Sequence, residues 1–182
     1  MNRATGGNQA TEVLKARTPH SGPDDRLTPT PLSSAYTIQG NADPRYRKAL
    51  RIMDRGGDLA AAYALLRTAA DDGDGLSIYA IATWYLHGTY VRRNVRLGNR
   101  MLKDAADKNV AAACADLGAS YYNGWGVSKS FNEAARYYMR AFLLGDLEAV
   151  EWLEQLLFWE GSKIKGRTIG RELGRLQAAR GL

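Results

Sequence analysis

Few residues of this sequence have the types and spacings that acid–base, nucleophilic or metal chemistry needs. His20 has no candidate partner, and His87 stands just before Gly88 at the expected end of a helix, where an imidazole faces solvent or caps a carbonyl. The single cysteine, Cys114, lies among alanines and is expected to be a buried, unreactive thiol. The sequence contains no G-x-S-x-G, P-loop, H-E-x-x-H or dinucleotide-binding motif. We therefore predict no enzymatic activity, no metal and no cofactor.

The most pronounced charge feature is a basic segment near the C-terminus. Residues 161–182 hold six Lys or Arg and one acidic residue, whereas residues 110–160 hold three basic and seven acidic residues. Two interpretations stay open: the basic side chains form the solvated face of a capping helix, or they form a patch for nucleic acid, anionic lipid or an acidic partner. The residues of this candidate patch are Lys163, Lys165, Arg167, Arg171 and Arg175.

Aromatic side chains are the other candidate binding groups. Trp125 lies between two glycines in an expected loop, where an indole is hard to bury, and exposed aromatic residues are typical anchors for a partner. Trp84 and Trp152 fall on helix faces that we expect to be buried or half-buried. The candidate partner-binding residues are Trp84, His87, Tyr90, Tyr122, Trp125 and Trp159.

The chain that must position these residues has 182 residues, enough for one domain or a short repeat array. It is 45% hydrophobic and 24% charged, which is sufficient to bury a core, and it has no run of about 18 apolar residues that would span a membrane. Because residues 1–37 are polar and have no apolar core, we expect no Sec-type signal peptide, and the one cysteine allows no internal disulfide. We expect a soluble cytoplasmic protein, and secretion without a Sec signal stays open.

Two regions of different character divide the chain. Residues 1–42 hold every proline except Pro44 and are expected to form a flexible leader, with a secretion or docking signal as the alternative. From Pro44 onward, apolar residues recur at helical steps of three and four. A shift of 36 residues aligns this region with itself. It places Gly73, Asn109, Gly145 and Gly181 at one position, where Gly or Asn ends a helix in the left-handed conformation.

This period predicts a helical hairpin as the repeating unit. In the clearest copy, one helix covers about residues 111–122, a loop covers 123–130, and a second helix covers about residues 131–144. Hairpins of this kind must stack to bury their apolar stripes. The domain at 43–182 then holds a degenerate first pair at 44–73, good repeats at 74–109 and 110–145, and a degenerate capping repeat at 146–181.

The clearest copy reads Leu117-Gly118-x-x-Tyr121-x-x-Gly124-x-Gly126-Val127, then Ala134-x-x-Tyr137-Tyr138-x-x-Ala141 and Gly145. In these positions it resembles a Sel-1-like repeat, a relative of the tetratricopeptide repeat. The preceding copy departs from the pattern at Ala82, Tyr90 and Gly98. The residues to which we assign a structural role in the repeat are Gly88, Ala105, Gly118, Gly124, Gly126, Ala134, Ala141 and Gly145.

The resemblance implies an all-α fold, a right-handed α-solenoid of about four antiparallel helical hairpins behind the leader. It also implies a non-enzymatic adaptor or regulator of bacterial type, which holds a partner protein or peptide on the curved repeat surface. Two alternatives stay open. One is a binder of nucleic acid or another anionic surface through the basic C-terminal segment, and the other is a secreted effector or inhibitor.

Overall fold

The computed structural model describes residues 42–160, 163, 164 and 166, and the regular structure in this part of the chain is entirely helical. The helices are α2 (Pro44–Asp54), α3 (Leu59–Asp71), α4 (Gly75–His87), α5 (Val95–Asp107), α6 (Ala111–Asn123), α7 (Phe131–Leu143) and α8 (Glu148–Glu160). Residues 1–41 of the expected leader lie outside the described residues, and so do Lys165, Arg167, Arg171, Arg175 and Gly181.

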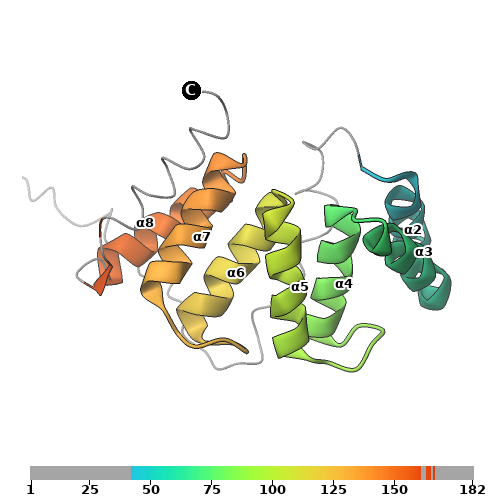
Figure 1. The fold of residues 1–182 in the computed structure, drawn as a ribbon, viewed down its shortest axis with the longest axis horizontal. Helices are drawn as coiled ribbons and strands as arrows, with labels where there is room; N and C mark the ends of the chain where they lie inside the picture. Colours follow the sequence, from blue (N-terminus) through green and yellow to red (C-terminus); the bar gives the residue numbers. More distant parts are fainter. Residues whose placement is uncertain (1–41, 161–162, 165, 167–182) are drawn as a thin grey trace, which may run out of the picture. The chain divides into compact units, whose positions relative to one another are not determined.

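The helices pair into antiparallel hairpins, and successive hairpins pack against one another in chain order (Figure 1). α2 packs with α3, α4 with α5 and α6 with α7. The α3–α4, α5–α6 and α7–α8 contacts join one hairpin to the next. The ends of α6 and α7 lie within one residue of the predicted bounds. The prediction of an all-α repeat fold is confirmed.

Short polar side chains begin most of these helices, because their oxygens accept hydrogen bonds from backbone N–H groups that the first turn leaves unpaired. Asp74 accepts from the Ser77 N–H at 2.8 Å before α4, and Ser130 accepts from the Glu133 N–H at 3.3 Å before α7. Asn94 does the same for α5. α6 is an exception, since Val110 precedes it and provides no side-chain cap.

The repeat ends lie where the 36-residue period predicts them. Gly73 has φ +90°, Asn109 has φ +62° and Gly145 has φ +102°, so all three adopt the left-handed conformation after the second helix of a hairpin. Asn109 is the one residue other than glycine with positive φ in the described part of the chain. Asparagine tolerates this conformation better than most side chains do, which explains why it can replace glycine here.

Small residues bring the two helices of a hairpin close together. A Cβ atom at Gly118 would lie 2.6 Å from the ring carbon Cδ1 of Tyr138, so α6 meets α7 at a distance that only glycine allows. In the preceding hairpin the equivalent positions hold Ala82 and Leu102, and both are completely buried. The smaller glycine is therefore paired with the larger tyrosine in one hairpin, and the larger alanine is paired with the smaller leucine in the other. Other fully buried alanines in these interfaces are Ala105, Ala134 and Ala141.

Candidate protein-interaction surface

Two loops of the same shape connect the helices of the central hairpins. In the loop between α4 and α5, the Asn94 N–H donates to the Tyr85 carbonyl at 2.8 Å, and in the loop between α6 and α7 the Ser130 N–H donates to the Tyr121 carbonyl at 2.9 Å. Gly88 and Gly124 begin these loops in the left-handed conformation. Both loops lie at the same edge of the stack of helices, which we call the loop edge.

The second of these loops is fixed to the preceding hairpin. The side chain of Asn99 in α5 is 2% exposed and donates from Nδ2 to the carbonyls of Trp125 at 2.7 Å and Val95 at 3.0 Å. Gly126 has φ +65°, and a Cβ atom there would lie 2.8 Å from Val95 Cγ1. The loop backbone therefore lies directly on α5 and cannot shift without losing a buried hydrogen bond.

The first loop is joined to the hairpin before it by different chemistry. The residues 36 positions before Asn99, Ser120 and Gly126 are Tyr63, Trp84 and Tyr90, and their rings form one cluster. Ring centroids are 5.7 Å apart for Tyr63 and Trp84, 5.4 Å for Tyr63 and Tyr90, and 5.7 Å for Trp84 and Tyr90. Aromatic packing thus joins the α4–α5 loop to the hairpin before it, whereas a hydrogen bond from the Asn99 amide to a carbonyl joins the α6–α7 loop to the hairpin before it.

Two further hydrogen bonds connect the α4–α5 hairpin to the α6–α7 hairpin. Arg140 of α7 donates from Nη2 to the Ala106 carbonyl at 2.7 Å, at the C-terminal end of α5. Tyr79 of α4 donates from its hydroxyl to Asp116 of α6 at 3.1 Å. Together with the bond from Asn99, these contacts hold the two hairpins at three separate places.

Burial raises the pKa of the Asp116 carboxyl to about 6, and the hydrogen bond from Tyr79 offsets only part of this effect. Sequence analysis did not single out Asp116. Its one signal was an acidic residue inside an alanine-rich helix. In the described residues, no three His, Cys, Asp or Glu side chains gather as metal ligands. The side chain of Cys114 is buried.

The structure separates the predicted partner-binding residues into buried and accessible groups. Trp84 is only 3% exposed and packs against Tyr63 and Tyr90, so its place among the candidates is corrected to a core role. Tyr90 is 45% exposed and covers the outside of the same cluster. His87, Tyr122 and Trp125 are half-buried at the loop edge.

Contacts at the loop edge constrain some of these side chains. The ring of Tyr122 lies 5.7 Å from that of Phe131, with the Lys129 ammonium 5.6 Å from the Tyr122 centroid. Burial, with a smaller contribution from Arg93, lowers the pKa of His87 below its usual value. His87 is therefore a neutral group at neutral pH.

A family model described as the Sel1 repeat matches residues 52–74, 75–110 and 111–146. The chain belongs to the Sel1 repeat family. The last two matched segments hold the α4–α5 and α6–α7 hairpins, and α8 begins beyond the last matched residue. Sel1 repeat proteins generally mediate protein–protein interactions.

Two solved structures share the fold. A Sel1 repeat protein from Oxalobacter formigenes is 24% identical, with a TM-score of 0.56 over 61% of this chain and 86% of that chain. The protein c5321, a protective antigen present in uropathogenic Escherichia coli strains that displays an SLR fold, is 21% identical, with a TM-score of 0.63. That match covers 77% of this chain and 30% of c5321. A search of the curated proteins found no match.

The helix after the matched Sel1 repeats, α8, has a large exposed apolar surface. It packs on the preceding repeat through Ala149, Leu153 and Leu156, and it exposes other large side chains, namely Trp152, Leu157, Phe158 and Trp159. Trp152 is 47% exposed, although the sequence predicted a buried or half-buried face. It stands at the position of Asp116 in the repeat before. No described helix is long and apolar enough to cross a membrane.

The basic C-terminal residues are described only in part. Lys163 pairs with Glu160 at 2.6 Å, and its ammonium lies 5.2 Å from the centroid of the Phe131 ring. The other four residues of the candidate patch lie outside the described residues.

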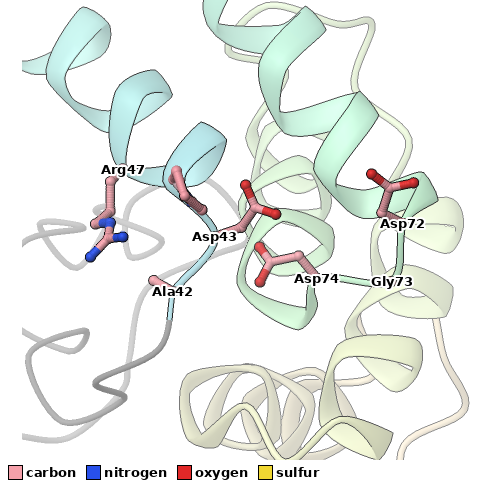
Figure 2. A pocket seen from close by; sticks show the side chains of 7 residues that line it. Ala42, Asp43, Arg47, Asp72, Gly73 and Asp74 are labelled. Carbon is pink, nitrogen blue, oxygen red and sulfur yellow. The ribbon is translucent and has the colours of Figure 1, made fainter.

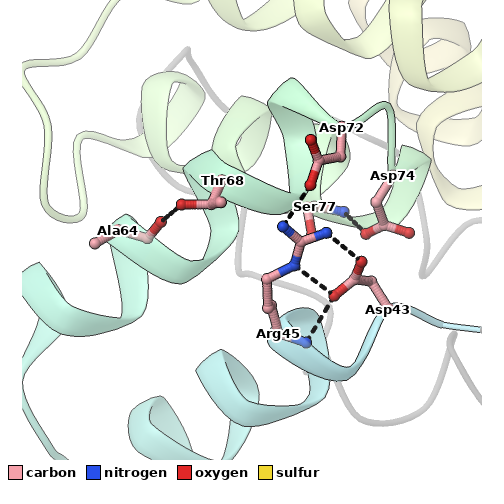
Figure 3. Close-up of polar contacts among 7 residues, drawn as sticks. All are labelled: Asp43, Arg45, Ala64, Thr68, Asp72, Asp74 and Ser77. Atoms are coloured by element: carbon pink, nitrogen blue, oxygen red, sulfur yellow. Dashed lines mark hydrogen bonds and ion pairs between the residues drawn. The ribbon is translucent and has the colours of Figure 1, made fainter.

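A shallow hollow of about 480 Å³ lies where α2 begins, beside the turn between α3 and α4 (Figure 2). Asp43, Asp72 and Asp74 line it, but each carboxylate already has a structural role. Arg45 bridges Asp43 at 2.7 Å and Asp72 at 2.5 Å, while Asp74 caps α4 (Figure 3). The hydrogen bond from Arg45 lowers the pKa of Asp43 to about 2. The hollow therefore lies where the first hairpin packs on the second.

Proposed function

We propose that this Sel1 repeat protein is a non-enzymatic adaptor that holds a partner protein on the loop edge. The observation that carries the proposal is the set of three hydrogen bonds, from Asn99, Arg140 and Tyr79, that fixes the α6–α7 hairpin on the α4–α5 hairpin. They make the two loops parts of one rigid surface. A rigid surface binds with less loss of conformational entropy, which amounts to about 0.5–1.5 kcal/mol for each side chain that binding would otherwise immobilise.

The loop edge provides suitable side chains for protein recognition. Tyr90 and Trp125 lie on successive loops, and Tyr122 lies at the end of the helix between them. Tyrosine and tryptophan are enriched among residues that dominate binding energy, because a single ring covers a large area at a small entropic cost. We place the partner across these two loops.

The test is affinity capture with the full-length chain from its native cell, followed by mass spectrometry at low and at physiological salt. The variant Trp125→Ala removes an aromatic side chain from the loop edge. Leu147→Ala is the control, because Leu147 is 73% exposed in the turn before α8 and belongs to the opposite edge. Circular dichroism and thermal unfolding establish that both variants are folded.

We expect a protein that survives physiological salt, is lost with Trp125→Ala and is kept with Leu147→Ala. Recovery of nucleic acid instead, lost as salt rises, would favour the alternative that assigns binding to the basic C-terminal segment. Equal capture by both variants would refute the assignment of the loop edge. We further propose a cytoplasmic location, which cell fractionation tests.

A further inference from the structure

The surface of the α4–α5 hairpin carries a row of arginines with no ion pair in the described part of the chain. Arg92, Arg96 and Arg100 follow one another at intervals of four residues, from the loop into α5, and all three are exposed. We call these three residues the arginine row. Arg96 and Arg100 lie on the same helix face, about 6 Å apart along its axis.

The repeat architecture does not require this row. In the next repeat the equivalent residues are Ser128, Asn132 and Arg136, so only one of the three is basic. That one is neutralised, because Arg136 pairs with Glu133 at 2.6 Å. The position of Glu133 is occupied by Leu97 in α5, which leaves Arg100 without the corresponding carboxylate.

Two arginines of the row, Arg92 and Arg96, also stand where a helix tolerates basic residues poorly. The N-terminal end of a helix carries a partial positive charge, and acidic residues are the stabilising choice in the first turn. α5 has none there, and Arg92, Arg93 and Arg96 surround its first residue, Val95. A local arrangement that opposes stability, and that the sister repeat avoids, is typical of a surface selected for binding.

We propose that the arginine row binds an acidic segment of the partner protein. This inference rests on the proposed adaptor function and specifies the partner. Guanidinium groups pair with carboxylates through two parallel hydrogen bonds. The spacing of about 6 Å matches carboxylates four residues apart on a helix or two apart on an extended strand. Tyr90, two residues before Arg92 in the sequence, is 45% exposed and offers an aromatic side chain to the same partner.

The surroundings of the row favour a short acidic protein segment over nucleic acid. A protein that makes about six to ten phosphate contacts depends on them for most of its affinity, whereas residues 92–103 hold five basic residues, of which Arg93 donates to the Leu86 carbonyl and Lys103 lies over the Tyr121 ring. Farther along α5, Asp104 and Asp107 are exposed, and residues 110–160 hold seven acidic and three basic residues. An extended polyanion leaving the row would meet these carboxylates, whereas two or three acidic side chains would not.

Fluorescence anisotropy with the full-length chain tests the proposal, using a labelled peptide of alternating glutamate and leucine as the probe. The variant R92Q/R96Q/R100Q removes the row. The control R47Q/K48Q/R51Q removes the same charge from exposed positions of α2. We expect the first variant to bind the peptide about tenfold more weakly and the control to change binding less than about twofold, with affinity falling as salt screens the charges.

Three results would overturn the proposal. One is no measurable binding of the peptide by the wild-type chain. Another is an equal loss in both variants, which would mean that only net charge matters. The last is tighter binding to labelled oligothymidylate, or to phosphatidylglycerol vesicles, with a loss in R92Q/R96Q/R100Q, which would assign the row to nucleic acid or to a membrane surface.

The same variant separates this inference from the adaptor function. If the wild-type chain captures a partner from cells and R92Q/R96Q/R100Q captures it equally well, the arginine row is not its binding site and the adaptor function stands. If the wild-type chain captures no protein partner, the adaptor function itself fails, whatever the peptide does.

Discussion

The loop between α6 and α7 should be pressed against α5 tightly enough that one methyl group destabilises the protein. In Gly126→Ala the new Cβ would lie 2.8 Å from Val95 Cγ1 and 3.0 Å from Asn99 Nδ2. It would also place a side chain at φ +65°, in the left-handed region. We expect the loop to move away, so that the hydrogen bond from Asn99 to the Trp125 carbonyl breaks.

The chain contains a matched control for the backbone part of this effect. Gly56 has φ +64°, and a Cβ atom there would meet nothing within 4 Å. Gly56→Ala should therefore cost only the left-handed strain, about 1 kcal/mol. Gly126→Ala adds the steric overlap and the loss of one of the two acceptors of the buried Asn99 amide, which together bring the loss to about 3 kcal/mol.

Urea unfolding of the two variants and the wild-type chain measures both losses. The difference between the variants, about 2 kcal/mol, is the part due to contact between the loop and α5. Equal losses for Gly126→Ala and Gly56→Ala would show that the loop does not lie on α5, and the argument for a rigid joint would fail.

Three further predictions concern other contacts of the hairpins. Gly118→Ala should lower the free energy of unfolding by about 2 kcal/mol because of overlap with Tyr138, and G118A/Y138L, which recreates the alanine–leucine pair of the sister repeat, should recover most of it in urea unfolding. Because the pKa of Asp116 is raised in the folded state, its carboxyl favours folding at low pH and this contribution is lost as pH rises through about 6. Asp116→Asn should therefore flatten the fall in the free energy of unfolding between about pH 4 and pH 6, and the variant should be more stable than wild type at neutral pH. If the free energies of unfolding of the two proteins instead differ by the same amount at every pH, this prediction is wrong. Trp84→Ala should lose about 3 kcal/mol or more of stability, as expected of a core residue, whereas a variant as stable as wild type in thermal unfolding would restore Trp84 to the binding surface.

The period and the helix ends were predictable because they depend on local chemistry. A left-handed residue after each second helix needs Gly or Asn, and this need marks the same position in every copy, as Gly73, Asn109 and Gly145 show. The joints between hairpins were not predictable from one copy at a time. Tyr90 appeared as a departure from the glycine of the family pattern, yet in the structure Tyr63 and Trp84 compensate for it. The signal in the sequence was that Tyr63, Trp84 and Tyr90 all differ from their counterparts in the next repeat.

The arginine row was missed for a different reason. The six basic and five acidic residues of the stretch 69–109 nearly cancel, so the net charge of this stretch does not reveal the row. All the basic residues of this stretch except Lys108 fall between Arg92 and Lys103, and no acidic residue lies among them. Because electrostatic attraction decays within about 8 Å at physiological salt, the local cluster matters more to a ligand than the sum does.

The contacts between successive hairpins differ, aromatic in one place and an amide–carbonyl hydrogen bond in the next. This difference restricts the gain or loss of whole repeats in the gene. Unequal crossing-over that deletes one repeat would place Tyr63 opposite Ser120 and Gly126, leaving a void where two rings had been. A duplication would instead bring Trp84 and Tyr90 against Asn99, where the space holds only a backbone and an amide. Both products would be poorly packed, so recombination between repeats is disfavoured. We therefore expect the number and the order of these hairpins to be retained together.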